Sequence, residues 1–290
     1  MKYSKKLRDF LYGNIIGNII ILIIILSCVY GLIFLVRKYN NPFWDSSASV
    51  GDSSDTTDEN CTVLGIELHG SLYTYLPEHA EGDTNFDYDT VASENIILAI
   101  KQANQDEEIK AIILEVDSSG GSPIAGEEIS IAVKNSKKPV VALIREIGAS
   151  ASYLAISSAD KIFASKYSDV GSIGVTMSYL NNVEKNRKEG YTYEQVSVGK
   201  YKDAGSPDKA LTSEEKTLFL RDTKIIYENF IKAVSDNRKI PLDKVRSFAD
   251  GSTVLGEKAR EIGLIDEIGG LPEVEKYIEE KIGEKPEICW

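Results

Sequence analysis

The chain has 290 residues, of which 42% are hydrophobic and 27% charged, and its formal net charge is −12. This acidic balance argues against a nucleic-acid partner, because nucleic-acid binding needs a basic surface. The three cysteines show no metal-ligand spacing, and no zinc, haem or P-loop pattern is present, so the sequence predicts neither a metal nor another cofactor.

Near the N-terminus, residues 14–36 form an apolar run without a charge, long enough to cross a bilayer as a helix. Lys and Arg outnumber acidic residues in 1–13, which keeps this segment in the cytoplasm and sends the rest of the chain across the membrane. No small-residue cleavage site follows the run, so it predicts an uncleaved anchor. We therefore expect a single-pass protein of the cytoplasmic membrane whose folded part lies outside the cytoplasm.

Residues 37–61 form a polar linker rich in Ser, Asp and Thr, and residues 62–290 are enough for one folded domain. Cys28 falls within the apolar run, whereas Cys61 and Cys289 lie at opposite ends of the domain. An oxidising compartment would permit a bridge between these two cysteines. The sequence leaves open whether they pair.

Strands and helices alternate along the domain, which is typical of βαβ units and a mainly parallel sheet. The first half predicts strands at 63–68, 109–116 and 140–144, helices at 93–104 and 125–135, and a helical stretch ending near residue 160. The second half predicts a strand after residue 174, a long helix at 213–238 with a capped start, a helix from 255, a turn at 263, a short strand at 264–265 and a last helix from 272. The chain is thus predicted to have an α/β fold.

The segment 148–153, with sequence GASASY, follows a predicted strand and opens a helix. Such a strand, small-residue turn and helix can expose a nucleophile at a helix N-terminus, which makes Ser150 a candidate. The alternative is that Ser150 only caps the helix. The two histidines, His69 and His79, lie well upstream, so a lysine within 199–207 is the better candidate for a base.

Two more loops adjoin predicted strands, and each contains glycine. After the strand at 109–116, Gly120 and Gly121 open a turn into a helix, where paired N–H groups can bind an anion or an oxyanion. Most glycine pairs, however, only form turns. The loop 169–175 places Ser172 between two glycines and indicates no chemistry by itself.

Together these loops resemble the signal peptide peptidase A (SppA) family of Ser-Lys dyad membrane serine proteases. The resemblance extends over residues 62–270 and is carried by four blocks: LEVDSSGG at 114–121, GASASY at 148–153 with ADKI at 159–162, GSIGV at 171–175, and YKDAGSP at 201–207 with AREIGLIDEIGG at 259–270. It implies a ClpP/crotonase-like fold of repeated β-β-α or βαβ units around a mainly parallel sheet, here preceded by one transmembrane helix.

The resemblance also implies a role for each matching residue. Ser150 occupies the nucleophile position, and Lys202 matches the general base. Ser172 would hydrogen-bond this lysine and help to hold it neutral. Lys200, two residues away, is expected to be a solvated surface lysine.

An oxyanion hole is implied at the N–H groups of Gly120 or Gly121 and of Ala151. The sequence departs from the family pattern at three positions: Ser119 stands where the family has proline, and Ala151 and Ser152 stand where it has glycine. Ser152 is therefore a second candidate nucleophile.

The function implied is a membrane-anchored endopeptidase that uses a Ser-Lys dyad to cleave signal peptide remnants or other apolar peptides. Half-length members of the family form rings in which the serine of one protomer meets the lysine of its neighbour, so a homo-oligomeric ring is expected. Whether the dyad forms within or between protomers stays open. Two alternatives are an acyl-CoA hydratase or isomerase of the related fold, which needs neither an anchor nor a paired lysine, and a non-catalytic membrane scaffold that binds apolar peptides.

Overall fold

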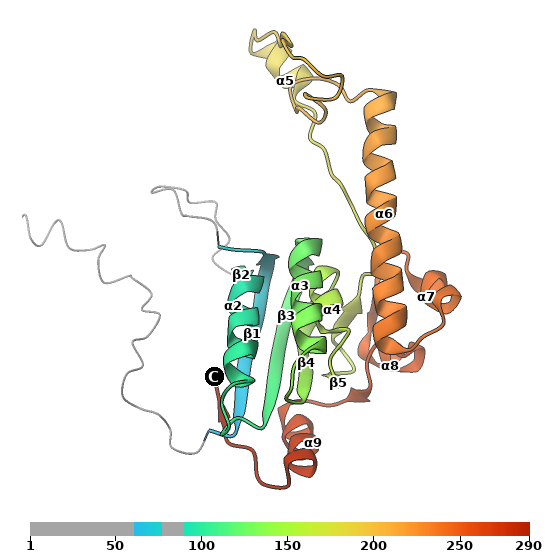
Figure 1. The fold of residues 1–290 in the computed structure, drawn as a ribbon. Helices are drawn as coiled ribbons and strands as arrows, with labels where there is room; N and C mark the ends of the chain where they lie inside the picture. Colours follow the sequence, from blue (N-terminus) through green and yellow to red (C-terminus); the bar gives the residue numbers. More distant parts are fainter. Residues whose placement is uncertain (1–60, 77–89) are drawn as a thin grey trace, which may run out of the picture. The chain divides into compact units, whose positions relative to one another are not determined.

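A sheet of nine strands organises the part of the chain that the computed structural model describes, residues 61–76 and 90–290 (Figure 1). The predicted anchor at 14–36, the predicted cytoplasmic segment 1–13 and the linker up to residue 60 lie outside these residues. Within the described ranges, no helix combines the length and apolarity needed to cross a membrane.

The sheet is almost entirely parallel. Its main order is β2-β1-β3-β4-β5-β8, while β6 pairs with β4 and β7, and β9 pairs with β1. Only β6 and β7 pair antiparallel among the described strands. The strands are β1 (Val63–Tyr73), β2 (Thr90–Ala92), β3 (Ala111–Gly121), β4 (Val140–Ala149), β5 (Lys161–Ala164), β6 (Asp169–Gly171), β7 (Thr253–Leu255), β8 (Glu267–Ile268) and β9 (Ile288–Cys289). The predicted α/β fold with a mainly parallel sheet is confirmed.

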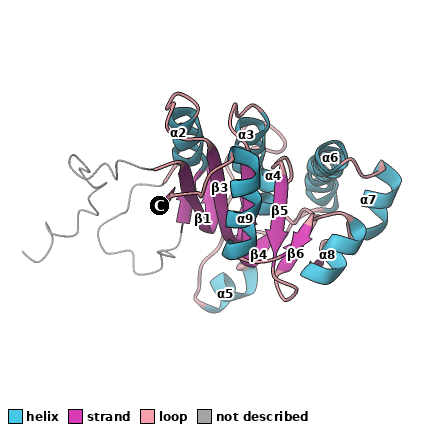
Figure 2. Cartoon of the chain, turned by 90° about the horizontal axis from the view of Figure 1, so that it is seen from below, coloured by secondary structure: helices cyan, strands magenta, loops and turns pink. Residues whose placement is uncertain are grey.

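Helices cover both faces of this sheet (Figure 2). Side chains from α2, α3, α4 and α6 pack on one face, and α9 packs on the other. The helices are α2 (Ser93–Ala103), α3 (Pro123–Lys134), α4 (Ala151–Ile156), α5 (Val183–Lys188), α6 (Ser213–Arg238), α7 (Leu242–Phe248), α8 (Gly256–Ile262) and α9 (Leu271–Ile282). This arrangement buries the central strands on both sides, as their nearly unbroken apolar sequence requires.

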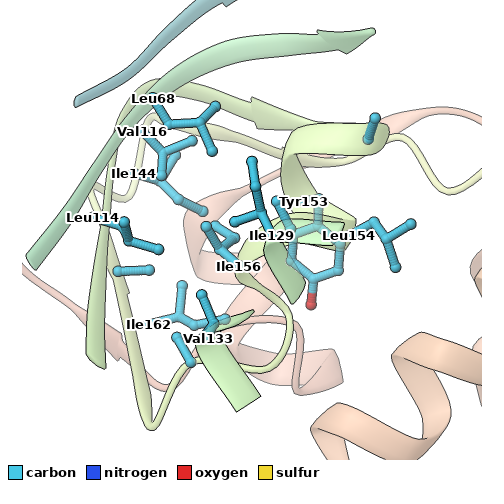
Figure 3. Close-up of a cluster of buried hydrophobic side chains, with 14 of the residues drawn as sticks. Leu68, Leu114, Val116, Ile129, Val133, Ile144, Tyr153, Leu154, Ile156 and Ile162 are labelled. Carbon is cyan, nitrogen blue, oxygen red and sulfur yellow. The ribbon is translucent and has the colours of Figure 1, made fainter. Parts of the chain in front are cut away.

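The central strand β3 shows how alternation distributes its side chains between two cores. Leu114 and Val116 point toward α3 and α4, whereas Ile113 joins the smaller core beneath α9. In the larger core, Tyr153 lies among aliphatic side chains, and its hydroxyl donates a hydrogen bond of 2.7 Å to the carbonyl of Leu264 (Figure 3). Burial raises the pKa of this phenol well above its usual value, so the hydroxyl stays a donor.

Two strand predictions are wrong. Residues 264–265 are buried but form the turn after α8, because the N–H of Leu264 donates to the carbonyl of Ala259. Their apolarity reflects burial in the larger core, and the strand that pairs with β5 is β8, three residues later. The strand predicted directly after residue 174 is not formed, because β6 ends at Gly171 and the next described strand is β7. The helical stretch predicted to end near Asp160 stops at Ile156.

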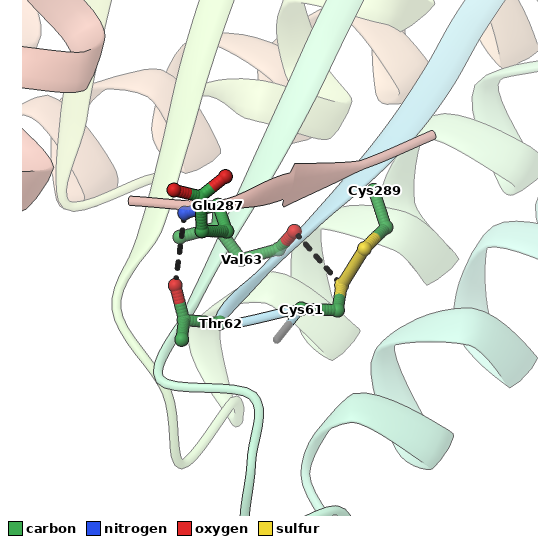
Figure 4. Close-up of a disulfide and its surroundings, with 5 residues drawn as sticks. All are labelled: Cys61, Thr62, Val63, Glu287 and Cys289. Atoms are coloured by element: carbon green, nitrogen blue, oxygen red, sulfur yellow. Dashed lines mark hydrogen bonds between the residues drawn. A yellow bond between two sulfur atoms is a disulfide. The ribbon is translucent and has the colours of Figure 1, made fainter. Parts of the chain in front are cut away.

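Cys61 and Cys289 form a disulfide whose Cα atoms are 5.9 Å apart (Figure 4). This pairing, which the sequence left open, follows from the sheet: β9 lies beside the start of β1, with Leu64 opposite Cys289. The N–H of Glu287 adds a hydrogen bond of 3.0 Å to the hydroxyl of Thr62. The two ends of the domain are therefore joined at one corner of the sheet.

Candidate functional site

The candidate nucleophile Ser150 forms the whole connection between β4 and α4. Its backbone has φ 54° and ψ −126°, a conformation that residues other than glycine rarely adopt. Such strain costs about 1–3 kcal/mol and persists only where the surroundings impose it. Here the N–H of Ser150 donates a hydrogen bond of 2.7 Å to the carbonyl of Gly171 on the neighbouring strand β6. The result is the sharp strand-to-helix turn that presents a nucleophile.

Ser150 occupies the N-cap position of α4, and its carbonyl accepts the N–H of Leu154 at 3.0 Å, but its side chain does not act as a cap. Its side chain makes no capping hydrogen bond to α4, and its backbone lies outside the extended region that N-cap residues use. The side chain is half-buried, and no hydrogen bond to its hydroxyl is formed by the described residues. The Ser150 hydroxyl thus remains available for chemistry.

Ser152, the second candidate nucleophile, occupies a different environment. It is fully buried, and its hydroxyl accepts a hydrogen bond of 2.9 Å from the N–H of Ala149. The same oxygen lies 2.7 Å from the carbonyl oxygens of Ser118 and Ala149. A substrate carbonyl cannot reach an oxygen enclosed in this way, so Ser152 is a structural partner of the turn.

The glycine turn at the end of β3 lies directly against Ser150. A Cβ placed on Gly120 would stand 2.8 Å from the Cβ of Ser150 and 2.9 Å from the backbone nitrogen of Ala151. One on Gly121 would stand 2.2 Å from the carbonyl oxygen of Leu72. Both glycines also have positive φ, 107° and 155°. Only glycine therefore lets β3 approach the serine turn this closely.

The predicted oxyanion donors differ in availability. Ala151 is the first residue of α4, so its N–H has no partner within the helix, and no acceptor for it occurs among the described residues. By contrast, the N–H of Gly120 donates a hydrogen bond of 3.1 Å to the hydroxyl of Ser118. The Ala151 N–H is the donor that stands ready beside Ser150.

Ser172 also lies next to the serine turn, because it follows the carbonyl of Gly171 that binds Ser150. Its hydroxyl donates a hydrogen bond of 2.8 Å to the carbonyl of Gly251, and its N–H donates one of 3.1 Å to the carbonyl of Ser252. The lysine contact that the resemblance implies for Ser172 is not formed within this chain. Instead, the hydrogen bonds of Ser172 connect the end of β6 to the loop between α7 and β7.

Lys202 stands in the loop between α5 and α6, with an exposed side chain. Its backbone N–H donates to the carbonyl of Gly199 at 3.1 Å. The next residue, Asp203, accepts a hydrogen bond of 2.7 Å from the hydroxyl of Tyr193 and lies 3.4 Å from the ammonium of Lys209. These contacts hold the Asp203 carboxylate within the loop and away from solvent-facing Lys202.

The loop is attached to the far end of α6. Lys209 forms an ion pair of 2.7 Å with Glu215 in the first turn of this helix, whereas Asn237 near its last turn donates to Ser157 at the end of α4. From Glu215 to Asn237 the helix axis extends about 33 Å, at 1.5 Å per residue. Figure 1 shows α5 and the following loop at the end of α6 that lies away from the sheet. One chain by itself therefore does not bring Lys202 to Ser150.

Of the two histidines, His79 lies outside the described residues. His69 belongs to β1, and its Nε2 is 3.3 Å from a carboxylate oxygen of Glu115. The other oxygen of Glu115 forms an ion pair of 2.6 Å with Arg145. His69 is thus part of a cluster of ionisable side chains across three strands, and no hydrogen bond joins it to Ser150.

A cavity of about 340 Å³ opens beside the Ser172 loop. The residues around it come from the segment after β6, from α6 and from the loop after α7, and include Gly174, Val175, Thr223, Lys224, Tyr227 and Asp250. The sequence pattern did not indicate these α6 residues, because three positions on a polar helix carry no motif. Their proximity depends on how α6 crosses the loop.

Comparison with known proteins gives the family. The family model described as "Peptidase family S49" matches residues 132–284. A Methanocaldococcus jannaschii protein named as a protease is 32% identical over 228 residues, covering 77% of this chain and 73% of its own length. An Enterococcus faecium protein named as a signal peptide peptidase SppA is 28% identical, covering 79% and 66%. The chloroplastic serine protease SPPA of Arabidopsis thaliana is 31% identical, covering 62% of this chain and 27% of its own length.

Among solved structures, a ClpP1 variant from Listeria monocytogenes matches with a TM-score of 0.47 and 14% sequence identity, covering 72% of this chain and 92% of its own. Family membership rests on the sequence matches. These set aside the hydratase and scaffold alternatives in favour of a hydrolase. The chain belongs to peptidase family S49, the SppA family of serine proteases.

Proposed function

We propose that this chain is a membrane-anchored endopeptidase in which Ser150 is the nucleophile and Lys202 of a neighbouring copy is the general base. The observation that carries the proposal is the strained turn at Ser150, with φ 54°, where no described residue bonds to the Ser150 hydroxyl or to the N–H of Ala151 beside it. A serine held in this conformation at a cost in stability is typical of a catalytic elbow.

The chemistry follows from these atoms. The Oγ of Ser150 attacks the peptide carbonyl while its proton passes to the neutral amine of Lys202. The carbonyl oxygen becomes an oxyanion, which the N–H of Ala151 stabilises together with an N–H of the glycine turn at 120–121; the N–H of Gly120 takes part by leaving the Ser118 hydroxyl. The C–N bond then breaks as the lysine returns the proton to the leaving amine, and water hydrolyses the acyl-enzyme on Ser150 by the reverse sequence.

A second copy is proposed because Lys202 belongs to a segment that stands away from the Ser150 of its own chain. This segment, residues 175–212, is here called the arm. Several of its apolar side chains are almost fully exposed, among them Leu180 (81%), Val196 (97%) and Val198 (98%). Exposed apolar side chains gathered on one segment mark an interaction surface. We propose that assembly of a ClpP/crotonase-like ring covers the arm and delivers its lysine to the neighbour's serine.

The proposed substrates are signal peptide remnants or other apolar peptides. Support comes from the apolar run at 14–36 and the charge asymmetry around it, which would hold the domain against the outer face of the cytoplasmic membrane. The disulfide between Cys61 and Cys289 fits an oxidising compartment outside the cytoplasm. A reporter fused after Trp290 tests this topology, and reporter activity found only in the cytoplasm would contradict it.

The decisive experiment labels the full chain in detergent with a fluorophosphonate, a reagent that phosphonylates activated serines. We expect one adduct, located by mass spectrometry on Ser150, and loss of peptide hydrolysis in step with labelling. Ser150→Ala should remove both while the protein stays folded. Lys202→Ala should slow labelling by about 10²-fold or more, since the serine loses its base.

Two results would overturn the assignment. One is labelling of a different serine in an active protein, and the other is a Ser150→Ala variant that still hydrolyses apolar peptides. The double variant His69→Ala and His79→Ala provides the control for the base. It should keep a near-normal rate, because neither histidine has a role in the proposed mechanism.

A further inference from the structure

The hydrogen bonds around Ser152 connect the two halves of the candidate site. Its hydroxyl accepts from the N–H of Ala149, the last residue of β4, and reaches the carbonyl of Ser118 on β3 at 2.7 Å. The hydroxyl carries one proton, so it can donate either to Ser118 or to the carbonyl of Ala149, also at 2.7 Å. In the first case the Ser152 hydroxyl joins Ala149, the residue before Ser150, to Ser118, which precedes the glycine turn at 120–121.

This link occurs where the regular sheet pairing fails. The register between β3 and β4 shifts between Val116 and Ser118, and the register between β1 and β3 shifts between His69 and Ser71. Such irregularities re-aim a strand but free backbone groups that then need partners. Side-chain hydroxyls supply them on both sides of β3.

On the β1 side, the fully buried hydroxyl of Ser118 donates a hydrogen bond of 2.6 Å to the carbonyl of Gly70. The same oxygen accepts the N–H of Gly120 at 3.1 Å. On the β4 side, the hydroxyl of Ser152 is the corresponding bridge. Two serine hydroxyls thus replace ladder hydrogen bonds at the level of the nucleophile.

We propose that Ser152 is a positioning residue for catalysis: it holds the glycine turn of β3 at a fixed distance from the Ser150 turn. This inference rests on the proposed function of Ser150. Ser152 touches no substrate. It acts through Ala149, which precedes the nucleophile, and through Ser118, which precedes the glycine turn. Without the bridge, the Ala151 N–H and the glycine turn lose their fixed relative orientation, and an oxyanion held between them is bound less well.

The test compares two buried serines of the same helix. Ser157 is as buried as Ser152, and its hydroxyl likewise makes two hydrogen bonds, donating to Leu154 and accepting from Asn237. Ser157 lies at the end of α4 opposite the site. Ser152→Ala and Ser157→Ala therefore remove equivalent buried hydroxyls, and their melting temperatures should fall by similar amounts.

Peptide hydrolysis should separate the two variants. We expect Ser152→Ala to lower kcat by about 10- to 100-fold with KM within about two-fold of the wild type, because the loss is confined to the transition state. Ser157→Ala should keep kcat near the wild-type value at temperatures where it is folded. Ser152→Cys, with a weaker donor in the same place, should lie between Ser152→Ala and wild type, and it decides the question if the alanine variant does not fold.

The outcomes distinguish this inference from the proposed function. If the wild type forms no adduct at Ser150 with a fluorophosphonate, the proposed function itself fails. If the wild type reacts at Ser150 while Ser152→Ala keeps the kcat of Ser157→Ala, Ser152 is only structural and this inference is overturned. A rise in KM with unchanged kcat in Ser152→Ala would overturn it as well.

Discussion

The backbone of Ser150 is the residue-scale feature on which the site depends. Its sequence context, small residues between a strand and a helix, predicted a turn but contained no information about φ. The positive φ arises for two reasons. The N–H of Ser150 donates to the carbonyl of Gly171 on β6, and Gly120 lies so close that a Cβ on it would stand 2.8 Å from the Cβ of Ser150. Both partners are distant in sequence, so no local pattern could predict them.

We predict that Ser150→Gly makes the protein more stable and inactive. Glycine adopts φ 54° without strain, so relief of about 1–3 kcal/mol outweighs the loss of about 0.5–1 kcal/mol from its greater freedom in the unfolded chain. The free energy of unfolding, measured with urea, should rise by about 1 kcal/mol. Ser150→Ala should be equally inactive but not stabilised, since it keeps the Cβ.

Lys239 provides the matched control for this prediction. It also has a positive φ, 58°, at the C-cap of α6, and it makes no contact with the serine turn. Lys239→Gly should be stabilised in the same way and keep full activity. A Ser150→Gly variant less stable than the wild type would show that the turn is not strained.

The identities of the site residues were predicted with uneven success, for the same physical reason. Gly120 and Ser150 lie in short motifs, and the structure brings these two residues together, whereas Gly121 packs against Leu72. The enclosure of Ser152 and the bond from Ser172 to Gly251 were not predicted. Each depends on a partner at least 34 residues away along the chain.

At the scale of elements, the long helix α6 matches its prediction at both ends. Its start was visible in the sequence as a capping box, and the structure contains both hydrogen bonds between Thr212 and Glu215. The short strands β2 and β5 to β9 and the helices α5 and α7 were missed or misplaced. Strands of two to four residues have too few positions to show alternation, and they exist only through pairing with distant neighbours.

Glu215 makes the start of α6 sensitive to acid. Its hydrogen bonds to Lys209 and to the N–H of Thr212 lower the pKa of this carboxyl from 4.5 to about 2. A group whose pKa is lower in the folded state stabilises the fold above its unfolded pKa. The stabilisation by Glu215 should therefore be complete above pH 4.5 and decline as the pH falls from 4.5 to 2.

We predict that Glu215→Gln is less stable than the wild type at pH 7 and that the difference disappears toward pH 2. Chemical unfolding followed by circular dichroism at a series of pH values measures it. Glu214→Gln removes the same charge from an exposed neighbour that pairs with Lys200 at the surface. This control should change stability little. A constant difference for Glu215→Gln across the whole pH range would contradict the assignment.

At the scale of the whole molecule, the site is divided between two regions. The proposed nucleophile Ser150 and the proposed oxyanion donor Ala151 follow the central strand β4, and the proposed base Lys202 lies on the arm, before the start of α6. The sequence motifs include both Ser150 and Lys202, but they give no information about the distance between these residues in space. That separation depends on the length and direction of α6, which only the packed fold determines.

We predict that two inactive variants restore activity when mixed. Ser150→Ala keeps its lysine and Lys202→Ala keeps its serine, so a mixed assembly contains some complete pairs. Mixed after dissociation and reassembly, they should recover up to about a quarter of the wild-type rate, because random assembly places an intact lysine beside an intact serine at that frequency. Lys202→Arg should not replace Lys202, since a guanidinium stays protonated.

Subunit exchange provides the control for this experiment. Failure of the variants to complement, together with a subunit exchange shown to be complete by fluorescence, would place the dyad within one chain.

We predict that the disulfide contributes to stability chiefly by restricting the unfolded chain. It closes a loop with a sequence separation of 228 residues. The double variant Cys61→Ser and Cys289→Ser should lose about 2–5 kcal/mol of unfolding free energy while keeping its active fold at 25 °C. Unfolding in urea with and without a reductant measures the effect, and an unchanged wild type under reductant would contradict it.

The same disulfide determines how the domain responds to mechanical force. Tension applied to the chain before Cys61 and after Cys289 passes directly through the sulfur–sulfur bond, since both cysteines lie at one corner of the sheet. The sheet and the serine turn are outside this load path. A domain pulled at Cys61 and Cys289 would therefore not lengthen between these two cysteines, and its catalytic geometry would stay unstrained until the bond is reduced.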